Sequence, residues 1–276
     1  MGIAFHIGSL EIHWYGIILV IAIIAATFLA RVEAKRRSDN PDHIFTALLF
    51  MVPLGFIGAR AYHVIDQWSY YRQNPSQIIG GAGLGIFGAV IGGFIGLLIY
   101  TRWKKFSLPH WLDIVAPGLI LAQAIGRWGN YFNQELYGKP TTMPWGIKID
   151  NPIAPYTSDQ RFHPLFFYES MLNLLGCILL LAIGRKYKDR LLDGDIFCLY
   201  VIYYSTIRFG LEWLRIDNWK IAGFPTACWI SIAAVIISIS IMVYRRHRRR
   251  RLDIDHPSQS GGESPEPPSN DTKEAV

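Results

Sequence analysis

Few residues of this 276-residue sequence are suited to covalent cross-links or metal sites. Its three cysteines, Cys177, Cys198 and Cys228, lie in apolar stretches without a partner at the spacing of a metal site or a hairpin disulfide. We interpret them as small buried hydrophobes. The sequence also lacks a His-x-x-x-His pair, a Gly-x-Ser-x-Gly turn and a nucleotide-binding fingerprint. These absences argue against a disulfide scaffold, a zinc enzyme, a serine hydrolase and a nucleotide-binding protein.

Positive charge is missing from the first 30 residues. The basic residues Arg31, Lys35, Arg36 and Arg37 follow the first apolar stretch, whereas a secretory signal peptide carries its positive charge ahead of that stretch. The order predicts a retained helix whose N-terminus lies outside the membrane.

Apolar residues make up 51% of the sequence and come in long blocks. A bilayer is crossed by a helix of roughly 20 residues. The blocks are apolar nearly all round, whereas the core helices of soluble proteins keep a polar face. The sequence therefore predicts an all-α integral membrane protein with seven transmembrane helices. We place them at about 14–31, 44–66, 79–100, 109–126, 164–184, 194–214 and 222–244.

Basic residues alternate between the connections of these helices. Two thirds of the 27 Lys and Arg residues follow the first, third, fifth and seventh blocks. The positive-inside rule then puts the N-terminus outside and the C-terminus in the cytoplasm. We interpret the net charge of +6 as topology and attraction to anionic membrane lipids, with nucleic-acid binding by residues 245–251 as the lesser alternative.

Two segments outside the helices have distinct compositions. Residues 127–163 form the largest polar connection and are rich in proline, which predicts a small extracytoplasmic head without regular helix. Residues 252–276 contain proline, serine, glycine and acidic residues with almost nothing apolar, so we expect a disordered cytoplasmic tail. Residues 1–251 would form one seven-helix membrane domain that includes the head.

One polar stretch, residues 126–138, lies where the fourth apolar block ends. It combines Arg127, Asn130, Asn133 and Glu135 with aromatic residues. This mixture is costly at a membrane boundary unless the groups meet one another, water or a charged ligand, which makes the stretch a candidate functional site. A polar helix end that faces water is the alternative.

A second polar set lies near the end of the sixth helix. At about 100° per residue, its members fall within about 80° of one another and form one stripe, which consists of Tyr204, Arg208, Glu212 and Arg215. A self-neutralising Arg–Glu–Arg ladder is one interpretation. The ladder leaves a surplus positive charge, however, and such a charge at the depth of the lipid headgroups suits a phosphate.

Further candidates lie within the apolar blocks. Arg60 is flanked by small residues near the outer end of the second predicted helix. We give a structural and a functional role of Arg60 equal weight. Glu169 lies within an apolar block, so its carboxylate needs a partner or a proton. Gly88, Gly92 and Gly96 recur every four residues and form a stripe where another helix, or a lipid chain, can approach the backbone closely. Packing is favoured over a phosphate-cradling loop, since no Lys-Ser/Thr follows.

These residues, with His13 and His163, predict a cationic pocket that carries acid/base carboxylates and opens to the bilayer. Such a pocket is compatible with an enzyme, with a secondary transporter of an anionic lipid or solute, and with a heptahelical receptor or light sensor. A transporter should show paired broken helices in related halves. A light sensor needs a lysine in the last helix, and the sequence shows neither feature.

The stretch 126–138 resembles the signature of the bacterial prolipoprotein diacylglyceryl transferase family. The resemblance covers roughly residues 10–216, and the helix arrangement extends it to about 244. Other blocks similar to the family, in the same order, are residues 13–16, 58–60, 80–96, 144–146, His163-Pro164 with Tyr168-Glu169, and Arg208-Phe209 with Glu212 and Arg215.

The resemblance implies an enzyme that moves the diacylglyceryl group of phosphatidylglycerol to the lipobox cysteine thiol of prolipoproteins and releases glycerol phosphate. It places the catalytic arginines at Arg127 and Arg208, and Glu135, His163 or the arginine field would help to ionise the thiol. The predicted substrate-binding residues are Tyr15, Arg60, Asn130, Asn133, Gly138, Glu169, Glu212 and Arg215.

The implied enzyme is a multi-pass protein of the bacterial plasma (inner) membrane that requires no metal and no cofactor. Its partners would be phosphatidylglycerol, lipobox-containing prolipoproteins and membrane lipids, and no nucleic acid. The sequence departs from the family at one position, because Phe87 stands where many members have a histidine. Phe87 cannot transfer a proton, so a base at that position is not available to this chain.

Overall fold

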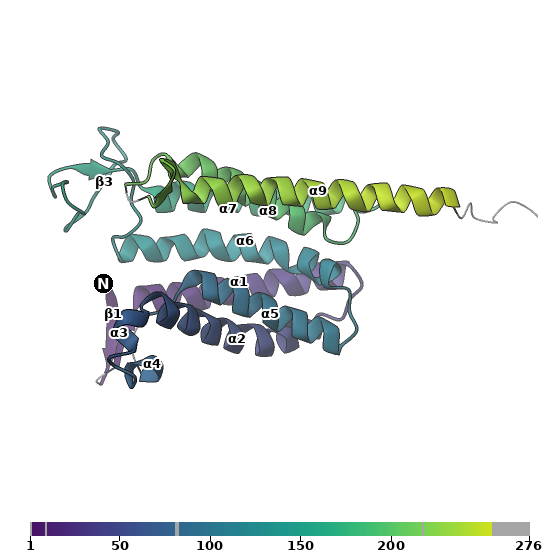
Figure 1. Cartoon of the computed structure of the whole chain (residues 1–276), viewed down its shortest axis with the longest axis horizontal. Helices are drawn as coiled ribbons and strands as arrows, with labels where there is room; N and C mark the ends of the chain where they lie inside the picture. Colours follow the sequence, from purple (N-terminus) through teal and green to yellow (C-terminus); the bar gives the residue numbers. More distant parts are fainter. Residues whose placement is uncertain (1, 9, 81–82, 217, 256–276) are drawn as a thin grey trace, which may run out of the picture. The chain divides into compact units, whose positions relative to one another are not determined.

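The structure is a computed structural model that describes residues 2–8, 10–80, 83–216 and 218–255. The chain divides into two units, residues 1–239 and 240–276, with α9 beginning in the first and ending in the second. The elements (Figure 1) are β1 Ile3–Ile7, β2 Leu10–His13, α1 Trp14–Arg36, α2 Asp42–Asp66, α3 Trp68–Tyr71, α4 Gln77–Gly80, α5 Ile86–Trp103, α6 Leu108–Phe132, β3 Ile147–Lys148, β4 Arg161–Phe162, α7 Leu165–Lys186, α8 Asp195–Glu212, β5 Lys220–Ile221, β6 Phe224–Pro225 and α9 Thr226–Asp255.

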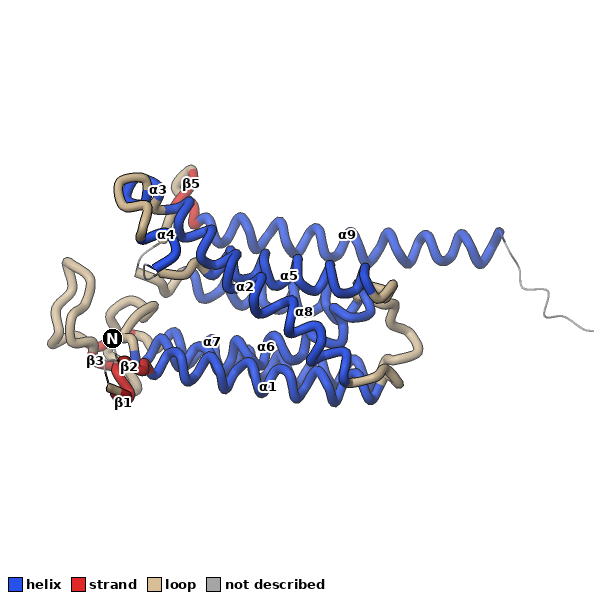
Figure 2. The backbone as a smooth tube through the Cα atoms, turned by 90° about the horizontal axis from the view of Figure 1, so that it is seen from below, coloured by secondary structure: helices blue, strands red, loops and turns tan. Residues whose placement is uncertain are grey.

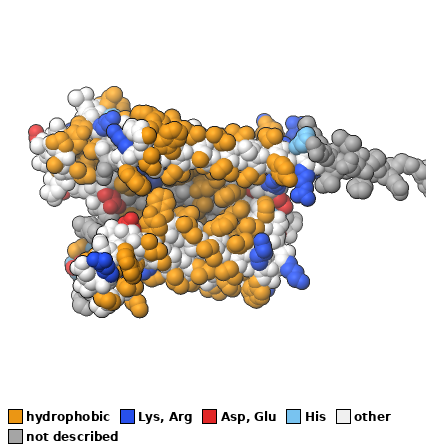
Figure 3. Space-filling view, viewed as in Figure 1, with side chains coloured by type: hydrophobic (Ala, Val, Ile, Leu, Met, Phe, Trp, Pro, Cys, Tyr) orange, Lys and Arg blue, Asp and Glu red, His pale blue; other side chains and the backbone are white. Residues whose placement is uncertain are grey.

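Within the described ranges, six helices are long and apolar enough to cross a membrane: α1, α2, α5, α6, α7 and residues 226–249 of α9. Large apolar side chains on them face outward, such as Phe28 at 70% and Leu49 at 74% exposure, and Figure 3 shows hydrophobic side chains over much of the visible face. Apolar surface of this extent is typical of helices that face lipid. The prediction of a helical membrane protein is confirmed for six spans. The sixth predicted span corresponds to α8, which is not among these six helices and carries charged residues near both ends, Asp195 at one and Arg208 and Glu212 at the other.

Several predicted boundaries differ from the structure. The third predicted span corresponds to α5, which begins at Ile86 instead of 79. Gly83 adopts a left-handed φ of 105°, which a continuous helix does not allow. The fourth predicted span corresponds to α6, which continues to Phe132. Arg127 therefore lies inside α6, and the polar connection starts at residue 133. Helix α9 reaches Asp255, four residues into the predicted tail, and the rest of that tail, 256–276, lies outside the described residues.

Helix α6 is the central element of the first unit. It packs against α1, α5, α7 and α8, and it contributes buried residues to two hydrophobic clusters, with Trp111 and Ile114 on one side and Ile120 on the other. Small residues allow the closest contacts: a Cβ at Gly118 would lie 2.6 Å from the carbonyl oxygen of Ala26 on α1. Helix α6 is therefore held in place by α1, α5, α7 and α8.

Helices α2 and α5 form a tightly packed pair. The predicted glycine stripe of α5 lies on this contact, and a Cβ at Gly92 would approach the carbonyl oxygen of Leu54 to 2.0 Å. A Cβ at Gly88 would meet the carbonyl oxygen of Gly58 at the same distance. The prediction that this stripe packs against a helix is confirmed.

The connections segregate to the two ends of the first unit. One end holds the β1–β2 hairpin, α3, α4 and the polar connection with the β3–β4 pair, and the α1–α2, α5–α6 and α7–α8 connections lie at the other (Figures 1 and 2). At this second end His110 binds Asp39 at 2.7 Å and Asp193 at 3.0 Å, so the start of α6 is tied to two connections. We call the first end the hairpin end and the second the basic end.

Candidate active site

At the hairpin end of α6, Arg127 forms a buried ion pair with Glu169 of α7. Arg127 Nη2 lies 2.5 Å from Glu169 Oε1, and the glutamate is only 4% exposed. Arg127 Nη1 also donates to Oδ1 of Asn130, one turn further along α6, at 3.4 Å. The partner that the sequence requires for Glu169 is therefore the arginine of the 126–138 stretch.

Helix α8 brings a second ion-pair system to the same place. Arg208 Nη2 lies 2.6 Å from Glu212 Oε2, and Arg215 Nη1 lies 3.7 Å from the same oxygen. Arg208 Nη1 is 4.0 Å from Glu169 Oε2, which joins the two systems. The predicted Arg–Glu–Arg ladder is confirmed, and it is continuous with the Arg127 pair.

The combined cluster carries a surplus of positive charge. Three guanidinium groups face two carboxylates, and both carboxylate side chains are at most 6% exposed. Arg215, which follows α8, has a pKa below its ordinary value because of its burial and the nearby Arg208 guanidinium. A cation whose charge is disfavoured in this way is stabilised by an added anion.

A narrow cleft, which we call the arginine cleft, lies between these groups. Its volume is about 10 Å³, room for about one water molecule. The arginines occupy most of the space with their own carboxylate contacts, so a larger anion must displace part of the ladder. The cleft is lined by Arg127, Asn130, Leu136, Leu165, Phe166, Glu169, Arg208, Leu211 and Arg215.

Glu135 lies beside the arginine cleft and is exposed. Its Oε1 accepts hydrogen bonds from the side-chain amides of Asn130 at 2.8 Å and Asn133 at 3.3 Å. The residues on either side, Gln134 and Leu136, have left-handed φ angles of 52° and 55°. Non-glycine residues rarely adopt this conformation and it is costly, so the turn that directs Glu135 back toward α6 is held by its surroundings.

His163 and Gly138 lie at the junction between the polar connection and the end of α8. The Gly138 N–H donates to the His163 carbonyl at 2.9 Å, and Gly138 forms a β-bridge with Arg215. The His163 ring contacts the Tyr168 hydroxyl at 3.1 Å. Neither residue lines the arginine cleft, and their predicted roles with the substrate stay predictions.

Three other residues from the sequence analysis lie on different surfaces. The Tyr15 ring packs on the backbone of α6, where a Cβ at Gly129 would approach it to 2.5 Å. Arg60 donates to the carbonyl oxygens of Gln77, Ile78 and Gly83, and so holds the α2–α5 connection. Phe87 is 59% exposed on α5. The structure does not bring Arg60 or Phe87 to the arginine cleft.

Tyr204 is part of the cluster although the sequence analysis gave it no role beyond the polar stripe. Its hydroxyl donates to Glu169 Oε1 at 3.2 Å and lies 3.4 Å from Arg127 Nη2. The available signal was its position four residues before Arg208 on the same helix face. Its burial against α6 and α7 depends on tertiary packing.

The fold and the site together define a helical membrane protein with a buried, surplus-cationic cluster at one end of its spans. Among the described residues, no group of three His, Cys, Asp or Glu side chains could hold a metal ion. The chain belongs to the prolipoprotein diacylglyceryl transferase family, because the model of that family matches residues 2–244. It is therefore assigned to a transferase family, in preference to a transporter or a receptor.

Relatives of similar length support this assignment. A phosphatidylglycerol–prolipoprotein diacylglyceryl transferase of Streptococcus equi subsp. zooepidemicus is 39% identical over 258 residues, which cover 91% of this chain and 96% of the relative. The protein of the same name in Pediococcus pentosaceus is 39% identical over 262 residues, with 92% and 93% covered. That of Chloroflexus aggregans is 37% identical over 263 residues, with 86% of each chain covered.

Proposed function

We propose that this chain transfers the diacylglyceryl group of phosphatidylglycerol to the lipobox cysteine thiol of prolipoproteins. The reaction forms a thioether, releases glycerol phosphate and is the first step of lipoprotein maturation. The names of the relatives state the lipid and the protein substrate. The observation that carries the proposal is the cluster of Arg127, Arg208 and Arg215 around two buried carboxylates, which leaves one positive charge for one lipid phosphodiester.

The charge of the cluster suits the bond that breaks. The thiolate attacks the glyceryl carbon, the carbon–oxygen bond to phosphate breaks, and the electron pair leaves with that oxygen. The phosphate gains a second negative charge, which Arg127 and Arg208 stabilise by charge-assisted hydrogen bonds that strengthen as the charge develops. Glu169 and Glu212 hold the two guanidinium groups in place, and Asn130 and Asn133 orient the oxygens of the headgroup.

The attacking thiol must lose its proton, since a free cysteine has a pKa near 8.5. The sequence analysis left Glu135, His163 and the arginine field as alternatives. Of these, Glu135 lies next to Asn130 at the edge of the arginine cleft.

For the membrane arrangement, we propose α8 as the seventh span. Its 18 residues extend about 27 Å along the axis, close to the ~30 Å of a hydrocarbon core. Its charged residues lie in its end turns, where Asp195 starts the helix and Arg208 pairs with Glu212. The basic end would then face the cytoplasm and the hairpin end the outside of a bacterial plasma membrane, with residues 133–164 as the extracytoplasmic head.

Mass spectrometry tests the proposed reaction. Purified protein in phosphatidylglycerol vesicles is incubated with a synthetic lipobox peptide, and the peptide is weighed. We expect a mass gain of one diacylglyceryl group, and no gain with a peptide in which serine replaces the cysteine. Phosphatidylcholine vesicles supply the headgroup control. An unmodified cysteine peptide after prolonged incubation with the folded protein would contradict the proposed function.

A further inference from the structure

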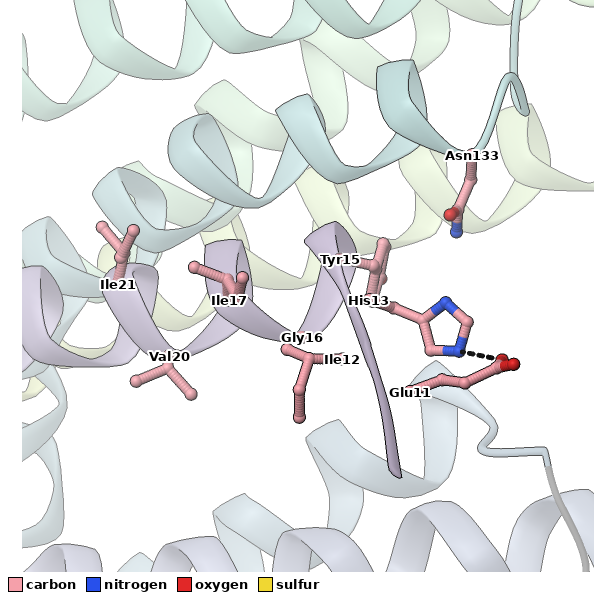
Figure 4. A pocket seen from close by; sticks show the side chains of 9 residues that line it. All are labelled: Glu11, Ile12, His13, Tyr15, Gly16, Ile17, Val20, Ile21 and Asn133. Atoms are coloured by element: carbon pink, nitrogen blue, oxygen red, sulfur yellow. Dashed lines mark ion pairs between the residues drawn. The ribbon is translucent and has the colours of Figure 1, made fainter. Parts of the chain in front are cut away.

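A second and larger cavity lies along the start of α1, near the residue that follows α6. Its volume is about 750 Å³, and it runs from the β2 strand along the first turns of α1 (Figure 4). Its far part is apolar, and its polar side chains gather where β2 meets α1. The lining residues are Glu11, Ile12, His13, Tyr15, Gly16, Ile17, Val20, Ile21 and Asn133, and we call the space the α1 cavity.

His13 is the unusual member of this lining. Its Nδ1 is shielded from solvent and has no hydrogen-bond partner within the described part of the chain. Its Nε2 lies 4.0 Å from Glu11 Oε2, and Figure 4 shows the ring between Glu11 and Asn133. At 4.0 Å the Glu11 contact is too long for a hydrogen bond, so neither ring nitrogen forms a hydrogen bond with a described residue.

The charge of the α1 cavity excludes the lipid phosphate. None of its lining residues is Lys or Arg, and its titratable side chains are Glu11, His13 and Tyr15. An anion would meet the Glu11 carboxylate without a compensating cation. The other substrate reacts through a neutral thiol, which the Glu11 carboxylate does not repel and which can meet the imidazole.

Glu135 links the two cavities. Its Oε1 accepts one hydrogen bond from Asn133, which lines the α1 cavity, and one from Asn130, which lines the arginine cleft. One carboxylate oxygen therefore contacts a lining residue of each cavity, which places the two linings next to each other at the end of α6.

We propose that the α1 cavity binds the acceptor peptide and that His13 is the base that ionises its thiol. The inference rests on the proposed function and assigns the proton of that reaction. The thiol proton moves to the His13 imidazole, the sulfur forms its bond to the glyceryl carbon, and the carbon–oxygen bond electrons leave with the phosphate. Glu11 stabilises the resulting imidazolium, which then releases its proton to water. This assignment supplies the base that Phe87 cannot provide.

A pair of acceptor peptides tests the role of His13. One carries cysteine at the reacting position, and the other carries selenocysteine, whose selenol is already ionised at neutral pH and needs no base. We expect His13→Asn to lower the transfer rate to the cysteine peptide by about 10²-fold to 10⁴-fold, the usual contribution of a general base. The rate to the selenocysteine peptide should fall less than tenfold. Equal losses with both peptides, in a variant that unfolds at the wild-type temperature, would overturn the assignment.

The wild-type protein gives a second test that does not depend on the folding of a variant. Transfer to cysteine should fall as the pH decreases from about 8 to about 7, because the thiol must lose its proton before it reacts, and transfer to selenocysteine should stay level because the selenol stays ionised over this range. His247→Asn, which replaces an exposed histidine of α9, is the matched control and should transfer to both peptides at the wild-type rates. Selective loss with cysteine in His163→Asn and not in His13→Asn would overturn the assignment and move the role to His163. Wild-type protein that modifies neither peptide contradicts the proposed function itself, which separates the two failures.

Discussion

Arg127→Met separates the contribution of the Arg127–Glu169 pair to stability from its contribution to the reaction. The substitution removes the Nη2–Oε1 contact of 2.5 Å and leaves Glu169 buried, with Arg208 at 4.0 Å and the Tyr204 hydroxyl at 3.2 Å. Breaking a buried pair typically costs about 3–5 kcal/mol. Because two partners remain, we expect about 3 kcal/mol, seen as a lower unfolding temperature in detergent.

The double variant Arg127→Met/Glu169→Leu removes both buried charges. Apolar residues of similar volume often replace a buried ion pair without loss of stability, so the free energy of unfolding should return to within about 1 kcal/mol of the wild-type value. The transfer rate should stay about 10²-fold to 10³-fold below wild type, because the developing phosphate charge has lost a donor. Thermal unfolding and peptide mass spectrometry are measured on the same preparations.

Arg37→Met is the matched control for this experiment. Arg37 forms a comparable pair with the buried Asp113 at 3.7 Å, but at the basic end. We expect a loss of stability with an unchanged transfer rate per folded molecule. Recovery of the wild-type transfer rate in Arg127→Met/Glu169→Leu would refute the role of Arg127 as a phosphate ligand.

Three further substitutions test other parts of the site and fold. Tyr204→Phe removes the hydroxyl shared by Arg127 and Glu169. The peptide assay should show about a tenfold loss of rate, the effect of one hydrogen bond to a charged group. Tyr203→Phe is the control, because the Tyr203 hydroxyl donates to a backbone carbonyl, and it should show no such loss. Glu135→Gln should reduce the rate by about tenfold through misplaced asparagines, and an unchanged rate would show that the carboxylate does not position them. Gly92→Leu places a side chain against the backbone of α2. The free energy of unfolding should fall by at least 1–3 kcal/mol, roughly the cost of overpacking. Wild-type thermal stability in this variant would contradict the described α2–α5 contact.

The sequence predicted the spans because lipid-facing helices are apolar over their whole length, a signal that needs no knowledge of tertiary contacts. It predicted the ladder for a similar reason, since Arg208, Glu212 and Arg215 lie three or four residues apart at the end of α8. It did not predict the short strands. A strand of two residues, such as Ile147–Lys148, has no periodicity to detect.

The other features that the sequence did not predict involve contacts between residues that are far apart in the sequence. Within α6, which continues to Phe132, Arg127 pairs with Glu169, which lies 42 residues further on. The His110 contacts at the basic end join residues separated by 71 and 83 positions. Pairings of this kind depend on how the helices pack, which one sequence does not specify.

The balance of products tests the central claim most directly, namely that the arginine cluster binds the lipid phosphate while the diacylglyceryl group moves to the thiol. Peptide-linked diacylglyceryl and free glycerol phosphate are measured in the same reaction, for the wild type and for Arg127→Met/Glu169→Leu. We expect equal amounts of the two products from the wild type and a parallel loss of both in the variant. Diacylglyceryl peptide formed without an equal amount of glycerol phosphate, or formed at the wild-type rate by the variant, would contradict the account.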